Sequence, residues 1–569
     1  MHIDIVPNRD SPPAVLLRES YREGTKVRKR TLANLSALSA EQVDAIRRTL
    51  RGETLVPVAD LFEIVHSHHH GHVAAIRTAM KQLAFESLIA SRPSRERDLI
   101  VAMVMARIIE PTSKLATTRW WHTTTLPELC DVADADEDDL YAALDWLITR
   151  QEHIEKKLAA RHLHKGGFVL YDLTSSYFEG KTSPLAARGY NRDGKSGKLQ
   201  VNYGLLTDPR GRPVAVSVFE GNTGDPTTLL PQVEKLQKTF AIDQLVLVGD
   251  RGMISQKQIQ ALKQREGIDW ITALRTGAIR TLVDEGHLQL GLFDERNLFE
   301  VTHPDFPGER LVACRNPQLA LLRAHKRQSL LDATSRELET VRRMISRGTL
   351  KGKDAIGVRI GKVVDKYKMA KHLVLDIRDE GFDFHLDHDK VSAEAALDGI
   401  YVIRTSVPVQ RLAADDVVRS YKRLSQVERA FRSLKTIDLE VRPIRHWLED
   451  RVKAHIFLCM LAHYVVWHMI EAWRELLFCD EDQQAKHTRD PVAPARRSPA
   501  ALAKVHSKVL DDGTPVHSFQ TLLTDLSSIV SNACRRRGAS TDDQPTFEVV
   551  TTPHSTQQRA YDLLKSIHL

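Results

Sequence analysis

Apolar residues recur at helical spacing near the start of the chain and fall into short continuous runs further on. Residues 95–111 (RERDLIVAMVMARIIEP) have apolar positions three and four apart and end at a proline, which predicts a helix. Residues 112–121 (TSKLATTRWW) predict a second helix, with Thr112 or Ser113 as its cap. Two helices with a short break fit a helix-turn-helix DNA reader or a helical bundle. We expect residues 1–165 to be mainly helical, after a short start that can be extended, and to serve DNA binding or dimerisation.

Short apolar runs from residue 166 onward predict a sheet. Residues 168–173 (FVLYDL), 199–208 and 212–221 fit three strands, the last two joined by a DPRGR hairpin turn. A helix with an aspartate start, a strand ending in VLVGD, another helix and the strand IDWITAL complete residues 166–275. This order predicts an α/β fold, a mixed sheet covered by helices.

The pattern is interrupted between residues 276 and 398, which we interpret as an insertion with β-rich and helical parts. Its β-like pieces, such as RTLVDEGHLQLGLF and HLVLDIRDEGFDFHLD, flank a long charged helical stretch. The strand GIYVIRTS returns the chain to the sheet, and residues 399–480 supply the second part of the core. Residues 451–477 are apolar on most faces, which predicts a buried helix. Residues 481–569 are interpreted as a linker and a C-terminal tail.

Composition narrows the class of protein. Hydrophobic residues make up 42% and charged residues 27% of the chain, and no window approaches about 18 consecutive apolar residues, so we expect a soluble protein without a membrane segment. The start has no apolar signal core, and the five cysteines are far apart, so we expect a cytoplasmic protein without disulfides. The net charge of +7 permits a polyanionic partner. Basic runs such as residues 188–198 are individually typical of solvated surfaces.

Two predicted strands end in an aspartate. Asp172 follows an apolar run in VLYD, and Asp250 follows another in VLVGD. In open sheets of this kind, functional groups lie at the strand ends. Either acid alone is compatible with an ordinary turn, but two in one sheet favour a shared site.

A third acid comes from a predicted helix at residues 420–435. At about 100° per residue, Tyr421, Glu428, Arg432 and Lys435 fall on one side, next to an apolar stripe. The helix should therefore pack by its stripe and aim Glu428 along the rim of the sheet. An exposed Glu428 paired with Arg432 is the alternative. Three converging carboxylates are tolerated when they hold divalent cations, and Mg²⁺ prefers such oxygen ligands.

With these residues in place, the chain resembles the DDE transposases of bacterial insertion sequences, which have an RNase H-like core. The motifs are YDLTSSYFE, VLVGDRGM and YKRLSQVERAFRSLK. The long gap before the third motif suits the branch with a β-rich insertion before the catalytic glutamate. EGNTGDPTTL and RPIRHWLEDRVKAHIFLCMLA also resemble segments of that branch. The resemblance covers roughly residues 165–480.

The branch carries a Tyr-Arg-Glu-Lys signature, which this chain matches except at the arginine position, where Leu424 stands. Some members hold a flipped base with a tryptophan near the end of the insertion. This chain has no tryptophan between Trp270 and Trp447, so a tyrosine is the candidate substitute. The DNA-binding residues that the resemblance implies are Tyr421, Arg423, Arg432, Lys435, Arg251 and Tyr401.

The resemblance implies a DNA transposase. Asp172, Asp250 and Glu428 would be catalytic and would hold two Mg²⁺ ions, with Mn²⁺ as the expected substitute. Cleavage at the element end and attack of the freed 3′-OH on target DNA would follow. The implied partners are the terminal inverted repeats, target DNA and, in the DNA complex, a second copy of the chain, at the nucleoid in the cytoplasm. An RNase H-like nuclease without strand transfer and a non-catalytic DNA-binding relative remain as alternatives.

Two other features of the sequence bear on a metal site and on an ATP site, and neither site is indicated. The histidines of HSHHHGH (66–72) lack the spacing of a dedicated metal site, so we interpret them as structural or solvated. The phosphate-binding pattern GxxxxGK[ST] is absent from the sequence, so ATP is not implied.

Overall fold

The computed structural model describes the chain except for residues 10, 54, 56–60, 196, 290–292, 294–296, 483–488, 494–495 and 537–545. The described residues form two compact units. The first comprises residues 1–68 and 530–552, and the second comprises residues 69–529 and 553–569.

The first unit is rich in β-strands. An antiparallel sheet is followed by a helix, and these elements are β1 (His2–Val6), β2 (Ala14–Glu23), β3 (Lys26–Asn34) and α1 (Ala40–Leu50). A second sheet joins β4 (Phe62–His69), β15 (Val530–Arg536) and β16 (Phe547–Val550). The extended start is therefore much longer than the sequence led us to expect. Strand β3 is exposed at every residue and rich in lysine and arginine, so it lacks the apolar alternation by which strands are recognised.

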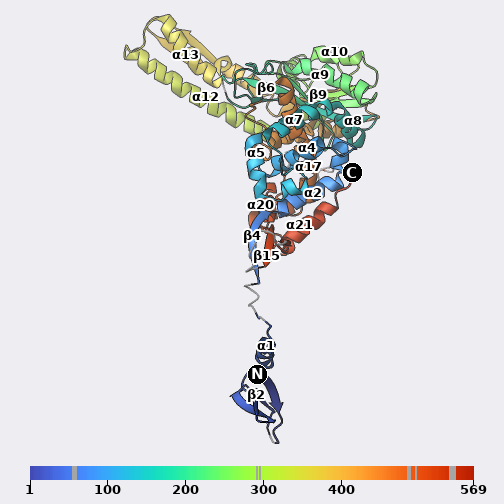
Figure 1. The fold of residues 1–569 in the computed structure, drawn as a ribbon. Helices are drawn as coiled ribbons and strands as arrows, with labels where there is room; N and C mark the ends of the chain where they lie inside the picture. The colour runs from blue at the N-terminus through green and yellow to red at the C-terminus, as the bar shows by residue number, and fades with distance from the viewer. Residues whose placement is uncertain are drawn as a thin grey trace. The chain divides into compact units, whose positions relative to one another are not determined.

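The described part of residues 69–165 is helical. In chain order the helices are α2 (Gly71–Gln82), α3 (Phe85–Ile89), α4 (Arg95–Ile109), α5 (Lys114–Trp120), α6 (Leu126–Leu129), α7 (Glu137–Thr149) and α8 (Gln151–His162). Helices α4 and α5 confirm the two predicted helices. Helix α4 is buried from Leu99 to Ile108 and packs against α7 and against α17 (Glu449–Ala472). This packing favours the helical bundle over the helix-turn-helix reader (Figure 1).

The core of the second unit is a mixed sheet whose strand order is β10-β11-β14-β9-β8-β5-β6-β7. Its central strands are β5 (Gly167–Tyr177), β6 (Gln200–Thr207), β7 (Pro213–Glu220), β8 (Leu245–Val248) and β9 (Ile268–Ala273). Strands β5, β6 and β7 pair antiparallel, whereas β8 and β9 run parallel to β5. With its three-strand meander followed by two parallel strands on the other side of the first, this is the RNase H-like arrangement. The predicted α/β fold is confirmed.

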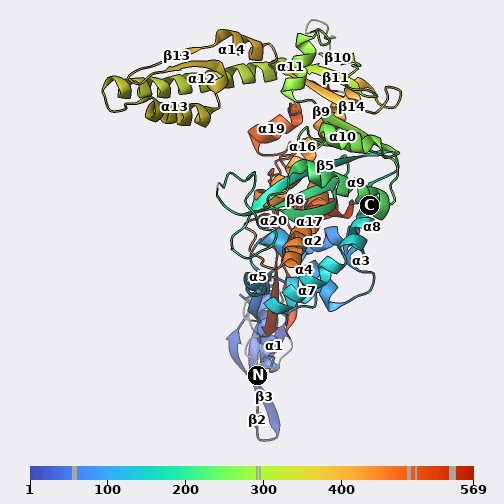
Figure 2. The same cartoon turned by 90° about the horizontal axis from the view of Figure 1, so that it is seen from above.

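Helices lie against the strands of this sheet (Figure 2). Helices α9 (Asp225–Glu234) and α10 (Gln256–Lys263) connect its strands, and α8 and α17 pack against β7. Helix α17 confirms the predicted buried helix. It is long and apolar enough to cross a membrane, but 83% of its 18-residue apolar window is buried, which is typical of a core helix.

The predicted insertion is divided between the sheet and a separate small core. Strands β10 (Leu298–Val301) and β11 (Arg310–Arg315) follow α11 (Thr276–Asp284) and extend the main sheet beside β14 (Ile400–Thr405). Leu338, Ile356 and Phe382 belong to the separate core, which projects from the sheet region (Figures 1 and 2). Its elements are α12 (Pro317–Ser346), α13 (Lys353–Tyr367), β12 (Leu373–Ile377), β13 (Phe382–Leu386) and α14 (His388–Ala395).

The C-terminal segment that we interpreted as a linker and tail contains ordered helices. They are α19 (Pro499–Ser507), α20 (Phe519–Ser527) and α21 (Ser555–Lys565). Helices α20 and α21 both pack against α2 of the bundle. Leu522, Leu526 and Leu564 are fully buried there, so helices α20 and α21 belong to the core of the second unit.

Candidate active site

Asp172 lies within β5, which continues to Tyr177 rather than ending at the acid, and Asp250 lies just beyond the end of the neighbouring parallel strand β8. The register of β5 and β8 pairs Leu170 with Val248, and each aspartate lies two residues beyond its member of that pair. Neighbouring strands are roughly 5 Å apart and side chains alternate with a period of two. The equal offset therefore brings the two carboxylates close together at the end of β8.

The environment of Asp172 disfavours its charged form. Burial, and to a smaller extent the negative charges of Asp250 and Glu428, raise the pKa of this carboxyl group to about 7. A hydrogen bond that the Leu173 backbone N–H donates to Oδ1, at 2.8 Å, acts in the opposite direction. A half-buried carboxyl group among other carboxylates is stabilised in its ionised form when a cation binds. The contributions to this pKa also place the three acids within electrostatic reach of one another.

Asp250 is held by the turn that follows β8. Its Oδ1 accepts hydrogen bonds from the backbone N–H groups of Gly252 at 2.9 Å and Met253 at 2.7 Å. Among the described residues, its Oδ2 has no hydrogen-bond partner. The turn therefore fixes the carboxylate and leaves one oxygen available to a ligand.

Glu428 reaches the site from helix α16 (Leu424–Arg432), which packs against β5. Val427, Ala430 and Phe431 are buried, and the Phe431 ring meets the Tyr203 ring edge-on at 5.9 Å. Glu428 itself is exposed, as the predicted packing requires. No ion pair joins it to Arg432 in the part of the chain that the structure describes, so the alternative of a simple surface pair is not supported.

The predicted helix at residues 420–435 is divided into three. Helix α15 spans Ala414–Lys422, and Arg423 is its C-cap. Helix α16 follows, and a π-helical turn, η5, spans Ser433–Ile437. These changes in winding move Tyr421 and Lys435 off a common face. Tyr421 stays at the acids: burial raises its pKa to about 12, with smaller contributions from the charges of Asp250, Asp172 and Glu428.

Lys435 lies elsewhere. It is buried, and its Nζ donates a hydrogen bond to Oδ1 of Asp193 at 2.9 Å. Arg442 approaches the same oxygen at 2.5 Å, and Oδ2 of Asp193 accepts from the Tyr177 backbone N–H at 3.0 Å. The charge of Lys435 is therefore used inside the protein.

The other predicted DNA-binding residues differ in exposure. Arg251 and Arg432 are exposed, and the charge of Arg251 acts on Tyr421 next to the acids. Arg423 is half-buried, and burial lowers its pKa. Tyr401 lies in β14 with its hydroxyl buried, and burial raises its pKa. Arg251 and Arg432 are thus the members of this set best placed to meet a phosphate backbone.

Sequence reasoning missed Arg192 and Tyr190. Arg192 forms an ion pair with Asp225, and its charge lowers the pKa of Asp172. Its guanidinium carbon lies 5.6 Å from the ring centroid of Tyr190, which is 82% exposed. Both belong to the basic run at residues 188–198, which was the only signal for them. The run lies at the acids because Asp193 is anchored to Tyr177 at the end of β5.

The acidic residues fit divalent cations such as Mg²⁺ and Mn²⁺. They offer carboxylate oxygens only, which these hard ions prefer over nitrogen and sulfur. Asp172 and Asp250 are fixed by backbone hydrogen bonds, and the repulsion that raises the pKa of Asp172 would be relieved by a bound cation.

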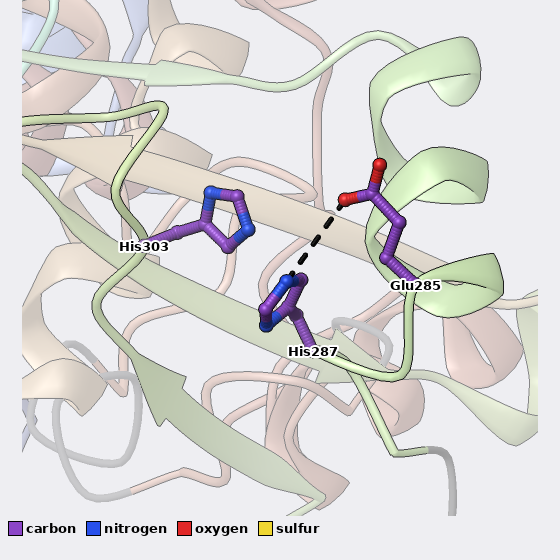
Figure 3. Close-up of side chains that lie close together, drawn as sticks. All are labelled: Glu285, His287 and His303. Atoms are coloured by element: carbon purple, nitrogen blue, oxygen red, sulfur yellow. Dashed lines mark ion pairs between the residues drawn. The ribbon is translucent and has the colours of Figure 1, made fainter.

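A second set of possible metal ligands lies at the far edge of the sheet. Glu285, His287 and His303 turn toward one another, and Nε2 of His287 lies 4.0 Å from Oε2 of Glu285 (Figure 3). His303 is buried, and its Nδ1 accepts a hydrogen bond from the Asp305 backbone N–H at 3.1 Å. Because Nδ1 uses its lone pair there, the neutral ring carries its proton on Nε2 and offers no lone pair to a metal. Two exposed ligands remain, fewer than a dedicated zinc site uses.

Two models of transposase families match the chain. A model of the transposase DDE domain matches residues 164–465, and a model of the IS1634 family transposase N-terminal domain matches residues 3–56. No curated protein matches the chain. Among solved structures, the chain is similar to a piggyBac transposase synaptic complex with hairpin DNA, with 10% sequence identity, a TM-score of 0.31, and coverage of 80% of this chain and 77% of that chain.

Proposed function

The chain belongs to the DDE transposases of insertion sequences, enzymes of metal-dependent DNA phosphoryl transfer, and we propose that Asp172, Asp250 and Glu428 are its catalytic metal ligands. The observation that carries this proposal is the state of Asp172, a half-buried carboxyl group whose pKa is raised to about 7 by burial and by the charges of Asp250 and Glu428. Such a group is costly unless a cation or a proton compensates it.

Two divalent cations, Mg²⁺ with Mn²⁺ as a substitute, would activate the attacking oxygen and stabilise the leaving oxygen of the phosphodiester. The chain's own groups would do the rest. Asp250, held at Oδ1 by the turn, keeps Oδ2 in a fixed direction. Arg251 and Arg432, both exposed, bind phosphates on either side of the scissile bond. Tyr421, which lies next to the three acids, donates a hydrogen bond from its hydroxyl group to a phosphate oxygen.

The substrates we propose are the terminal inverted repeats of the element and then target DNA, which the freed 3′-OH attacks. Two ends must be brought together, so a homodimer in the DNA complex is proposed, acting at the nucleoid. Residues 1–165 serve DNA binding and dimerisation, and the match of residues 3–56 to a transposase N-terminal domain supports this part. Residues 166–275 and 399–480 form the two parts of the catalytic core.

The test uses a labelled duplex that carries the element's own terminal repeat and its flank. Purified protein is incubated with it in Mg²⁺, Mn²⁺ or EDTA, beside Asp250→Asn. Metal-dependent nicks at the repeat boundary that the variant does not make, followed by joining to a second duplex, are expected. Nicks without joining would favour an RNase H-like nuclease. Specific binding without cleavage in any metal would favour a non-catalytic DNA-binding relative.

A further inference from the structure

A basic pocket lies between the helical bundle and the segment that follows η5. It has a volume of about 370 Å³ and is bounded by the end of α4, the start of α5, α7, residues 440–446 and α17. The side chains that matter for its chemistry are Arg107, Lys114, Arg442, Arg445, His446 and His455. All of these elements belong to the second unit.

Lys114 is a buried cation without a counter-ion. Its residue is 5% exposed, and no hydrogen bond or ion pair reaches its ammonium group among the described residues. Burial, and to a smaller extent the positive charge of Arg107, lower its pKa to about 7. An unpaired buried charge is strongly unfavourable, and proteins usually remove it by pairing.

The carboxylates nearby do not neutralise Lys114. Asp145 forms an ion pair with Arg451 at 2.9 Å, and Glu179 forms one with Arg445 at 3.2 Å. Glu440 lines the pocket but is exposed. Arg107, itself buried, donates to the Thr112 carbonyl at 3.0 Å, which satisfies a hydrogen bond without removing charge. The pocket therefore keeps an excess of positive charge.

We propose that this pocket binds a phosphate group of the DNA backbone, with Lys114 and Arg107 as its principal ligands. The size of the pocket exceeds a single phosphate group, which leaves room for the attached sugars. Exposed Arg445 stands at its opening as a further phosphate contact. Assignment of the phosphate to DNA rests on the proposed function. The presence of an anion site rests on Lys114 alone.

The pocket is connected to the candidate active site by one residue. Arg442 lines the pocket and also binds Asp193 at 2.5 Å. Asp193 accepts a hydrogen bond from the backbone of Tyr177 at the end of β5. The residue before it in the chain is Arg192, whose charge acts on Asp172. A DNA strand bound in the pocket would thus lead toward the acids.

Lys114→Met tests the proposal, because methionine keeps the length and removes the charge. Lys504→Met is the matched control: Lys504 is 6% exposed, but it donates to the carbonyls of Arg474 at 3.2 Å and Leu477 at 3.3 Å. Without phosphate, Lys114→Met should melt above the wild type, whereas Lys504→Met should melt below it. Inorganic phosphate should raise the melting temperature of the wild type and of Lys504→Met, and leave Lys114→Met unchanged.

DNA binding is then measured against salt concentration. Lys114→Met should bind the terminal-repeat duplex roughly ten- to a hundredfold more weakly, with a salt slope lower by about one unit. Equal protection of all three proteins by phosphate, or a lower melting temperature for Lys114→Met, would overturn the anion site. Protection by phosphate with unchanged DNA binding would overturn the assignment to DNA in favour of a free phosphate. Metal-dependent cleavage by the wild type is scored separately, so failure of the proposed function is distinguishable from failure of the pocket.

Discussion

The ammonium group of Lys435 lies 2.9 Å from a carboxylate oxygen of Asp193, and the two side chains are 10% and 1% exposed. A lysine at this position of the motif was expected to hold DNA. Here it fixes the loop that carries Arg192, so its effect on the acids is indirect. We therefore infer that Lys435 is a positioning residue.

Substitution of Lys435 should lower stability more than DNA affinity. In Lys435→Met, Asp193 keeps Arg442 as a partner, so we expect a loss of about 1–3 kcal/mol in the free energy of unfolding. The salt slope of DNA binding should stay unchanged, because no phosphate contact is removed. Urea unfolding and DNA titrations at several salt concentrations measure the two effects. A slope lowered by about one unit would show that Lys435 contacts a phosphate directly.

Substitution of Asp172 should raise the stability of the metal-free protein and remove its response to metal. Asp172→Asn removes a carboxyl group that burial and its neighbours disfavour, so the metal-free protein should melt at a higher temperature than the wild type. Added Mg²⁺ should stabilise the wild type by mass action, and this increment should disappear in Asp172→Asn. After addition of EDTA, Asp172→Asn should again melt at a higher temperature than the wild type. An undiminished Mg²⁺ increment in the variant would contradict the proposed ligand role.

The exposed arginines near the acids should contribute to DNA affinity without sequence preference. Arg251→Ala and Arg432→Ala should each lower the salt slope by about one unit and weaken specific and non-specific duplexes alike. Lys81→Ala, an exposed cation at the end of α2, serves as the control for a general loss of charge. Equal effects of all three substitutions would assign the result to net charge rather than to contacts.

The acids could be predicted from sequence because their signals are local. Asp172 and Asp250 each follow a run of apolar residues, and Glu428 lies next to the apolar stripe formed by Val427 and Phe431. Asp250 lies beyond the end of β8 as expected, whereas β5 continues past Asp172 to Tyr177. The apolar runs and helical periodicity were nevertheless enough to bring the three residues together. The fold class followed for the same reason, since alternating apolar runs and helices specify a covered sheet.

Features that depend on long-range contacts could not be predicted. The partner of Lys435 is 242 residues away in sequence, and no spacing rule relates it to Asp193. No glycine or proline in residues 420–437 indicates the break at Arg423 or the π-helical turn at residues 433–437. Strands β10 and β11 were assigned to the insertion because their place in the main sheet depends on pairing with β14. Nothing in the sequence around Lys114 indicates that it is buried, because its burial depends on packing between distant segments.

The titration of Lys114 gives a prediction with a definite sign. Burial lowers its pKa from 10.5 to about 7. Between these values the unfolded chain carries a proton there that the folded chain lacks, so the Lys114 contribution to the free energy of unfolding rises with pH, by up to about 1.4 kcal/mol per unit. The advantage of Lys114→Met over the wild type should therefore be largest below pH 7 and vanish toward pH 10.5.

Urea unfolding of both proteins from pH 6 to 10, without DNA or phosphate, measures this difference. The charged and titratable groups around Lys114 are Arg107, Glu440, Arg442, Arg445, His446, His455, Cys459 and Tyr141. They are present in both proteins, so their own titrations cancel to first order in the comparison. Lys504→Met should instead stay below the wild type across the range, because it leaves two carbonyls without their donor and Glu481 without its ion-pair partner. A constant difference between Lys114→Met and the wild type would mean that the ammonium group keeps its proton throughout, and hence that it has a partner in solution.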